Sequence, residues 1–429
     1  MADRRRSLKL AVVGGGWAGL AAAVRGREAG HRITLFEMAG QLGGRAREVT
    51  IDGLALDNGQ HILIGAYQRC LALMQTVGCD AAGSLHRRPL ELRYPDGRGL
   101  RMPSGPPWLG FALAVGQARG WKLPERLAVL VAAARWATAG FRCDPALTVE
   151  QLSAGLPSAV RKLLIDPLCV AALNTPSRQA SAAVFLRVLR DALFVGRGSA
   201  DLLLPRRSLG ALLPQPAERW LRASGVELKL GKRVQVLQAH PDGWTLDDDA
   251  FDGIVLACSA REAARLAGPV APAWAAMAET LRYEPIMTVY VRCPGAKLGV
   301  PMTALFDGPQ APAQFVFDHG ALGGAAGVFA FVISGASAWV ERGALATAQA
   351  VLHQAVSAFA AGTWPSAPEV LRVVTEKRAT FKCTPGLKRP PALIAASLLG
   401  AGDYIDGPYP ATLEGAVRSG ELAISLLTA

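Results

Sequence analysis

A glycine-rich turn between an apolar run and a helical segment most constrains the fold of this chain. The turn has the spacing G-x-G-x-x-G, formed by Gly14, Gly16 and Gly19. The short apolar run at residues 8–13 predicts a buried strand, residues 18–29 predict a helix and residues 33–36 predict a second strand. Such a β-α-β unit binds the pyrophosphate of a dinucleotide, because the glycines allow a tight turn and the helix N-terminus offers free N–H groups.

An acidic residue at the end of the second predicted strand indicates how the ribose is held. Glu37 lies 18 residues after Gly19 (37 − 19). A carboxylate there accepts hydrogen bonds from both ribose hydroxyls and repels a 2′-phosphate, which argues against NADP. The next segment carries a second glycine-rich loop, Gly43-Gly44-Arg45, whose guanidinium can lie beside the diphosphate. An extended cofactor such as FAD uses this second contact, whereas a simple NAD site does not need it.

The size and composition of the chain favour two joined lobes with a large apolar surface. Its 429 residues exceed what one core usually organises, and 51% are hydrophobic against 19% charged. The net charge of +12 is dispersed without an aromatic-basic module, so an anionic membrane surface fits it better than nucleic acid. The basic start at Arg4, Arg5 and Arg6 resembles a secretory signal, but the glycine pattern that follows argues against that interpretation.

In residues 108–141 apolar stretches alternate with basic residues, and the pattern predicts helices interrupted by Pro124. The aromatic residues of this stretch are Trp108, Phe111, Trp121, Trp136 and Phe141. They face either a core or a membrane-resting surface, and the pattern leaves both interpretations open. The best apolar run is much shorter than the roughly 20 residues that a membrane span needs.

The cysteines and histidines indicate neither disulfide bonds nor a metal site. The seven cysteines are scattered without a C-x-x-C pair, which is typical of reduced thiols in the cytoplasm. The six histidines form no H-x-x-x-H or H-E-x-x-H pattern, so we expect no bound metal. We expect His31, His86 and His240 to lie at the surface.

Both ends of the chain resemble the flavin amine oxidase and carotenoid desaturase superfamily. The resemblance rests on GGGWAGLAAA, the LGGRA loop and the C-terminal run AGDYIDGPYPATLEGAVRSGELA. It implies an α/β fold in which a Rossmann-like FAD-binding domain, a parallel sheet plus a β-meander, is interleaved with an α+β substrate-binding domain. It assigns residues 1–79, 200–268 and 371–429 to the FAD-binding domain, and residues 80–199 and 269–370 to the substrate-binding domain.

The same resemblance implies which residues contact FAD. Gly402 and Asp403 would close on the ribityl chain and the diphosphate. The helix that begins near Leu413 would point its N-terminus at the flavin ring, where it favours negative charge. The full set of implied FAD contacts is Gly14, Gly16, Gly19, Glu37, Gly43, Gly44, Arg45, Gly59, Val234, Gly402, Asp403 and Leu413.

A closer resemblance covers the run from Asp57 to Tyr67, which contains Asn58-Gly59-Gln60-His61, and the run at 376–381. Both are similar to the hydroxysqualene dehydroxylases of squalene and hopanoid biosynthesis, although Ser208 stands where the wider family has glycine. The resemblance implies that reduced FAD removes the hydroxyl of a long isoprenoid, hydroxysqualene, with loss of water. It also implies a cytoplasmic enzyme attached peripherally to the inner face of the membrane and functionally coupled to squalene-pathway synthases.

Gln60 and His61 are the catalytic candidates. The pKa range of histidine suits His61 to donate a proton to the leaving hydroxyl, but its ring can also simply pack beneath the flavin. Three other activities remain open on this scaffold. They are an oxidative carotenoid or phytoene desaturase, an amine oxidase, and a carrier of prenyl lipids without enzymatic activity.

Overall fold

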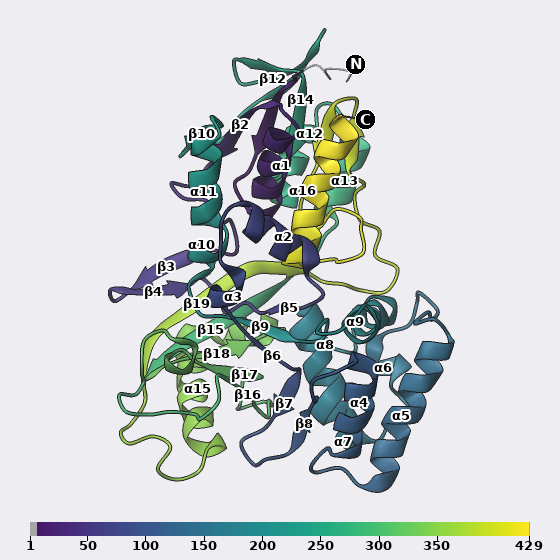
Figure 1. Ribbon diagram of the computed structural model, residues 1–429, viewed down its shortest axis with the longest axis vertical. Helices are drawn as coiled ribbons and strands as arrows, with labels where there is room; N and C mark the ends of the chain where they lie inside the picture. The colour runs from purple at the N-terminus through teal and green to yellow at the C-terminus, as the bar shows by residue number, and fades with distance from the viewer. Residues whose placement is uncertain (1–6, 429) are drawn as a thin grey trace.

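The computed structural model describes residues 7–428 and arranges them as two lobes (Figure 1). The first and last described segments, at residues 7 and 428, lie in the upper lobe of the figure, where helices flank a sheet. The lower lobe contains a second sheet and the helices of residues 107–194. Arg4, Arg5 and Arg6 lie outside the described residues.

A six-stranded sheet organises the upper lobe. Its strand order is β10 (Glu227–Leu230), β2 (Arg32–Glu37), β1 (Lys9–Val13), β14 (Gly253–Leu256), β21 (Leu398–Gly400) and β20 (Leu393–Ala395). Neighbouring strands are parallel except β20 and β21. A parallel sheet is covered on both faces, which explains the continuous apolar runs of β1 and β14.

Alternate residues of β1 serve the two faces of this sheet. Leu10 and Val12 pack toward α1 (Trp17–Glu28), α11 (Pro214–Ala223) and α16 (Leu413–Leu427). Ala11 and Val13 pack in the opposite cluster. That cluster contains α12 (Ala260–Ala267), α13 (Pro272–Glu279) and an antiparallel meander of β11 (Leu237–His240), β12 (Gly243–Leu246) and β13 (Asp249–Phe251). The predicted Rossmann-like domain with a β-meander is confirmed.

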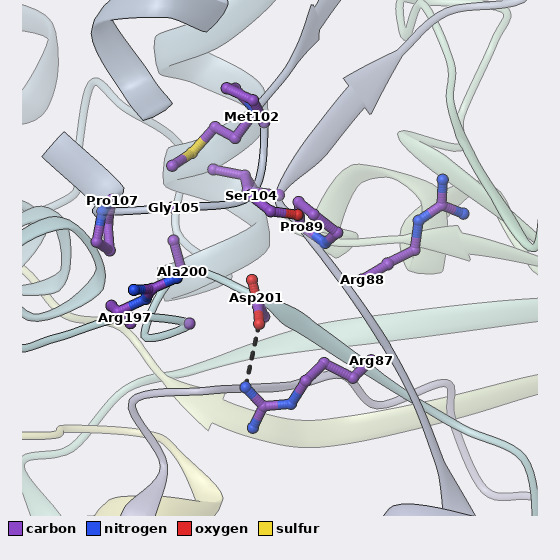
Figure 2. Close-up of a pocket in the computed structure, with 13 residues that line it drawn as sticks. Arg87, Arg88, Pro89, Met102, Ser104, Gly105, Pro107, Arg197, Ala200 and Asp201 are labelled. Atoms are coloured by element: carbon purple, nitrogen blue, oxygen red, sulfur yellow. Dashed lines mark hydrogen bonds and ion pairs between the residues drawn. The ribbon is translucent and has the colours of Figure 1, made fainter. Parts of the chain in front are cut away.

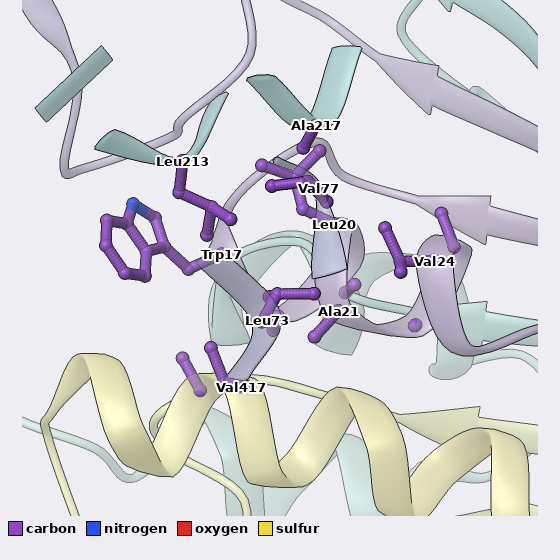
Figure 3. Close-up of a cluster of buried hydrophobic side chains, with 14 of the residues drawn as sticks. Trp17, Leu20, Ala21, Val24, Leu73, Val77, Leu213, Ala217 and Val417 are labelled. Carbon is purple, nitrogen blue, oxygen red and sulfur yellow. The ribbon is translucent and has the colours of Figure 1, made fainter. Parts of the chain in front are cut away.

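The first and last helices of the chain pack directly on each other. Figure 3 shows the apolar side chains of α1 between Val417 of α16 and Leu213 and Ala217 of the α10–α11 region. Gly420 makes the approach possible, because a Cβ there would lie 2.1 Å from the carbonyl oxygen of Ala18. The C-terminal helix is therefore fixed beside the helix that follows the glycine turn.

A five-stranded antiparallel sheet organises the lower lobe. Its strand order is β16 (Met302–Ala304), β17 (Phe315–Asp318), β18 (Val328–Ile333), β15 (Tyr283–Arg292) and β19 (Glu369–Phe381). α14 (Ser337–Arg342) and α15 (Ala344–Ala358) pack against one face. The predicted border at residue 371 falls inside β19, which pairs with β15 along nearly its whole length.

Helices fill most of the segment between residues 107 and 194. They are α4 (Pro107–Gly116), α5 (Leu123–Thr138), α6 (Val149–Leu152), α7 (Ser158–Val160), a π-helical turn (Arg161–Ile165), α8 (Asp166–Leu173) and α9 (Ala182–Phe194). Pro124 does not interrupt a helix as predicted; it lies in the first turn of α5, where its missing N–H costs no hydrogen bond. Trp121 is buried, whereas Trp108 is 56% exposed, so the aromatic residues of this stretch divide between core and surface.

Short elements join the lobes. Two hairpins pair β3 (Glu48–Ile51) with β4 (Leu54–Asp57), and β7 (Glu91–Arg93) with β8 (Gly99–Arg101). A small sheet has the order β5 (Leu63–Ile64), β9 (Leu202–Pro205) and β6 (Leu85–Arg88). Three short helices complete the connections: α2 (Gln68–Thr76), α3 (Ala81–Ser84) and α10 (Leu209–Leu212).

Candidate functional site

The glycine turn between β1 and α1 has the geometry of a pyrophosphate site. Gly14 has φ +111°, and its N–H donates to the carbonyl of Phe36 at 2.7 Å. A Cβ at Gly19 would lie 1.8 Å from the carbonyl oxygen of Gly14, so only glycine allows this contact between helix and turn. A Cβ at Gly16 would approach nothing closer than the Cα of Gly44, at 3.9 Å. The backbone at Gly16 therefore has room for a phosphate in front of the N-terminus of α1.

Glu37 ends β2 beside this turn and is 8% exposed. Its carboxylate accepts from the N–H of Gly15 at 2.7 Å and from the N–H of Ala39 at 2.8 Å. The segment after β10 runs alongside, because the N–H of Lys232 donates to the carbonyl of Glu37 at 2.9 Å. Val234 on this segment is buried, and its carbonyl accepts from Arg265 at 2.6 Å. The structure thus brings Glu37 and Val234 to the same end of the sheet.

The second glycine loop lies on the first. The N–H of Gly43 donates to the carbonyl of Gly15 at 2.8 Å, and Gly43 forms a β-bridge with Gly16. Gly44 has φ +61° and turns the chain, so that Arg45 points away from the strand that precedes it. The indole of Trp17, the first residue of α1, donates to the carbonyl of Ala46 at 3.2 Å and holds the loop in place.

Arg45 connects the beginning of the chain to its end. Its guanidinium forms an ion pair with Asp403 and donates to the carbonyl of Ala379, in β19, at 2.8 Å. Asp403 is 7% exposed, and its carbonyl accepts from the N–H of Ala411 at 3.1 Å. The Gly-Asp turn therefore lies one side chain away from the glycine loops, although about 360 residues separate them in sequence.

The C-terminal helix begins next to the Gly-Asp turn. The N–H of Gly402 donates to the hydroxyl of Ser419 at 2.8 Å, which fixes the turn to α16. Thr412 caps the helix by accepting from the N–H of Gly415 at 3.0 Å, and Leu413 is its first residue. The N-terminus of this helix, which is the positive end of the helix dipole, thus lies at the interface between the two lobes. It favours negative charge there.

The segment that carries Gln60 and His61 lies against the five-stranded sheet. A Cβ at Gly59 would lie 3.8 Å from the hydroxyl of Thr288 in β15 and 4.0 Å from the ring of His61. Oε1 of Gln60 and Oγ1 of Thr288 are buried, and neither finds a hydrogen-bond partner among residues 7–428. A buried polar atom without a hydrogen bond destabilises the folded protein, unless a bound ligand supplies the missing partner. Both atoms are therefore available to a polar group of a bound molecule.

The ring of His61 is held by its own segment. Nδ1 lies 2.8 Å from the carbonyl oxygen of Gly59, which can only accept, so Nδ1 is assigned the proton. Burial lowers the pKa of His61, and the positive charge of Arg45 lowers it further, while the hydrogen bond to Gly59 opposes them. When the pH is below that pKa, Nε2 is protonated as well as Nδ1, and the ring can donate the Nε2 proton.

Asp57 anchors this segment to both lobes and was not predicted as a functional residue. Its carboxylate accepts from the N–H of Leu209 at 2.7 Å, and its carbonyl accepts from the hydroxyl of Tyr290 at 2.8 Å. Burial and the neighbouring carboxylate of Glu48 raise the pKa of Asp57 to about 7, against the hydrogen bond from Leu209. Glu48 in turn accepts from Ser208, the residue that departs from the family pattern.

The family model for flavin containing amine oxidoreductases matches residues 17–423. The chain belongs to this family. It is an FAD-dependent oxidoreductase, and the residues of the site fit that cofactor. The open turn at Gly16, the carboxylate of Glu37 and the paired Arg45 and Asp403 are the kinds of groups that could hold an extended dinucleotide.

Relatives of this flavoprotein match it over nearly its whole length. It is 27% identical over 437 residues to hydroxysqualene dehydroxylase from Zymomonas mobilis, with 97% of this chain and 98% of that protein covered. It is 28% identical over 441 residues to hydroxysqualene dehydroxylase from Rhodopseudomonas palustris, with the same coverage. Among solved structures, an oxidoreductase from Methanosarcina mazei superposes with a TM-score of 0.74 at 16% identity, covering 97% of this chain and 100% of that one.

Within residues 7–428, no helix of the flavoprotein is both long and apolar enough to cross a membrane. All seven cysteines are free thiols.

Proposed function

We propose that this flavoprotein removes the hydroxyl of hydroxysqualene reductively, giving squalene in squalene and hopanoid biosynthesis. The observation that carries the proposal is the buried pair of unpartnered oxygen atoms, Oε1 of Gln60 and Oγ1 of Thr288, at the joint between the lobes. A substrate hydroxyl can form a hydrogen bond with either atom, whereas a pure hydrocarbon chain cannot. The likeness to two hydroxysqualene dehydroxylases over 97% of the chain supports the same substrate.

The cofactor is held in this proposal by residues from both ends of the chain. Glu37 would bind the ribose, Val234 would contact the adenine, and Arg45 and Asp403 would hold the diphosphate and ribityl chain. The backbone at Gly59 and the N-terminus of α16 at Leu413 face the flavin. The remaining contacts come from the glycines of the turns: Gly14, Gly16, Gly19, Gly43, Gly44 and Gly402. Residues 1–79, 200–268 and 371–429 then form the FAD-binding domain, and residues 80–199 and 269–370 the substrate-binding domain.

The reaction exchanges a carbon–oxygen bond for a carbon–hydrogen bond. Reduced FAD supplies the hydride and is oxidised by two electrons, and one proton leaves with the hydroxyl as water. The carbon–oxygen bond is allylic, so the positive charge left at carbon is delocalised. His61 in its doubly protonated form donates the proton through Nε2, and Gln60 and Thr288 orient the hydroxyl. The reaction requires that bulk water is kept from the carbon centre, because water would otherwise recapture it.

The substrate is insoluble in water, so we place the enzyme at the inner face of the cytoplasmic membrane, attached peripherally. α4 and α5 carry large apolar side chains that are exposed to solvent, among them Trp108, Leu113 and Leu127. The net charge of +12 suits an anionic surface. A synthase that forms the isoprenoid alcohol would deliver its product through the same bilayer, which couples the two activities functionally.

Product analysis tests the proposal directly. The holoenzyme is reduced photochemically under anaerobic conditions and incubated with hydroxysqualene in detergent micelles, and the products are identified by mass spectrometry. We expect squalene in an amount equal to the flavin reoxidised. The oxidised enzyme with phytoene and the oxidised enzyme with amines serve as comparisons. Formation of a desaturated carotenoid, or release of hydrogen peroxide from amines, with no squalene from hydroxysqualene, would contradict the proposal.

A further inference from the structure

A cavity of about 380 Å³ lies in the lower lobe, apart from the flavin site. Its walls come from the ends of β6 and β8, from the start of α4 and from the loop after α9 (Figure 2). The volume is in the range of small-molecule sites. The lining includes the guanidinium groups of Arg87 and Arg197 and the hydroxyl of Ser104, alongside the apolar side chains of Met102 and Leu90.

The charge of this cavity is positive. Figure 2 shows Arg87 and Arg197 near Asp201 and shows Arg88 pointing away from them. Asp201 pairs with Arg87 at 3.1 Å, and Arg88 pairs with Glu91. Within residues 7–428 no ion pair is found for Arg197, which is exposed. Its charge is therefore available to an anion that enters the cavity.

The start of α4 adds a second feature that favours an anion. Pro107 lines the cavity and is the first residue of this ten-residue helix, and no side chain caps the helix N-terminus. The first turn of a helix has N–H groups without partners and a positive dipole end. The guanidinium of Arg197 and this helix end therefore serve the same opening, which suits a phosphate.

The helices that lead away from the cavity expose an apolar surface. We call it the apolar stripe; it consists of Trp108, Leu109 and Leu113 of α4 and Leu123, Leu127 and Val131 of α5, each at least 41% exposed. The three residues of α5 are four apart, so they lie on one face of that helix. Val195, beside Arg197, is also exposed. Apolar side chains bordered by basic ones are typical of a surface that rests on a membrane.

We infer that the cavity binds the phosphate of an anionic phospholipid headgroup while the apolar stripe enters the acyl region beside it. The inference rests on the proposed membrane attachment and names the lipid group that positions it. The guanidinium of Arg197 can bind phosphate oxygens, while Arg87 stays paired with Asp201, and the acyl chains continue onto the adjacent stripe. The bilayer is the occupant because the cavity opens next to an apolar surface that a free phosphate would not need.

Vesicle binding of the holoenzyme tests the inference without measuring turnover. Partitioning to phosphatidylglycerol–phosphatidylcholine vesicles is compared with partitioning to phosphatidylcholine vesicles at low salt. Each basic residue at an anionic surface contributes about fivefold, so Arg197→Glu, a change of two charges, weakens binding about 30-fold. Arg25→Glu makes the same charge change on α1 of the upper lobe, where Arg25 is exposed, and we expect less than a twofold effect. Arg197→Lys retains most of the binding.

A matched pair of leucine variants tests the apolar stripe. Leu127→Gln weakens binding to anionic vesicles about tenfold, whereas Leu345→Gln, at a residue of α15 that is 75% exposed, leaves it unchanged. Flavin content and thermal midpoint verify that each variant is folded. The inference is overturned if Arg197→Glu behaves like Arg25→Glu, or if only the leucine variants matter. It is also overturned if inorganic phosphate displaces the protein as well as a water-soluble short-chain phosphatidylglycerol at equal ionic strength. Activity in detergent micelles is measured separately, so a failed lipid site and a failed dehydroxylase assignment give different results.

Discussion

Replacing Asp57 by asparagine isolates one buried charge at the joint between the lobes. Asp57 is 5% exposed, and its pKa is raised to about 7 by burial and by Glu48. Asparagine keeps an oxygen that can accept from the N–H of Leu209, and the backbone carbonyl still accepts from Tyr290. The substitution therefore removes the ionisation while preserving the connections of the segment that leads to Gln60 and His61.

The sign and size of the effect follow from proton linkage. Between the unfolded pKa of about 4 and the folded pKa of about 7, the folded protein holds a proton that the unfolded chain has lost. The contribution of Asp57 to stability is therefore complete below pH of about 4 and falls as the pH rises through about 7. The loss is ~4 kcal/mol in total, at 1.36 kcal/mol per unit of pKa shift. Asparagine does not titrate, so Asp57→Asn should gain ~3 kcal/mol over the wild type between pH of about 5 and about 8.

Urea denaturation of the holoenzyme at these two pH values, with excess FAD, measures the difference in free energy of unfolding between variant and wild type. Asp248→Asn, at an exposed carboxylate, is the control for the loss of a carboxylate at the surface. The other groups titrate in both proteins, so their contributions cancel when the free energy of unfolding of the wild type is subtracted from that of the variant. If the advantage of Asp57→Asn is the same at both pH values, Asp57 is not the buried, proton-holding group that the structure describes.

Three further changes test other parts of the molecule. Glu37→Gln should weaken FAD binding at least tenfold, because a charge-assisted acceptor for the ribose is lost; normal flavin content after dialysis would refute that role. Gly420→Ala should destabilise the protein by ~1–3 kcal/mol, because its Cβ would lie 2.1 Å from the carbonyl of Ala18; Gly116→Ala, with open space around it, is the control for the denaturation midpoint. Turnover that depends on protonated His61 should rise as the pH falls through its lowered pKa, with a midpoint below 6.5. His61→Gln should flatten the profile at normal flavin content, and an unchanged profile would make His61 structural.

The nucleotide half of the site was predictable because its signals are local. The glycine spacing, the apolar run before it and Glu37 all lie within about 30 residues, and β1, α1 and β2 begin and end within one residue of the predicted bounds. In contrast, the alternating pattern of residues 225–237 is typical of continuous strands, but the strand that forms there is Glu227–Leu230, and the next one, β11, begins only at Leu237. The N–H groups of Gly231 and Lys232 bond instead to the carbonyls of Ala39 and Glu37, a long-range contact that periodicity cannot reveal.

The positions of polar residues that belong to no recognisable motif were harder to predict. His31 was predicted at the surface, and this prediction is wrong. The ring is 4% exposed and accepts from the N–H of Leu8 at 3.2 Å, at the start of β1. Thr288 lies in an apolar, alternating stretch, residues 286–291, whose pattern is typical of a strand, but nothing in its sequence marks it as functional. Its importance comes from the packing of β15 against Gly59, which depends on how the two lobes join. The contact between Arg45 and Asp403 could not be predicted from local patterns, because about 360 residues separate them in sequence. Only the family resemblance placed both residues at the cofactor.

Thr288→Val offers a test that separates a structural hydroxyl from one that serves the substrate. Valine has nearly the same shape, and Oγ1 has no partner within residues 7–428, so its loss should leave stability unchanged or raise it by ~1 kcal/mol. If the hydroxyl orients the alcohol of the substrate, turnover of hydroxysqualene should fall about tenfold, because a net hydrogen bond contributes ~1 kcal/mol and one to a developing charge contributes more. Thr303→Val in β16, at the far edge of the same sheet and also buried, controls for the loss of a hydroxyl elsewhere in that sheet. A desaturase acting on pure hydrocarbon has no group for Oγ1 to bind, and for such an enzyme the substitution should be neutral or favourable to activity. A stable variant with full dehydroxylation activity would therefore remove Thr288 from the site and weaken the argument for an oxygen-bearing substrate.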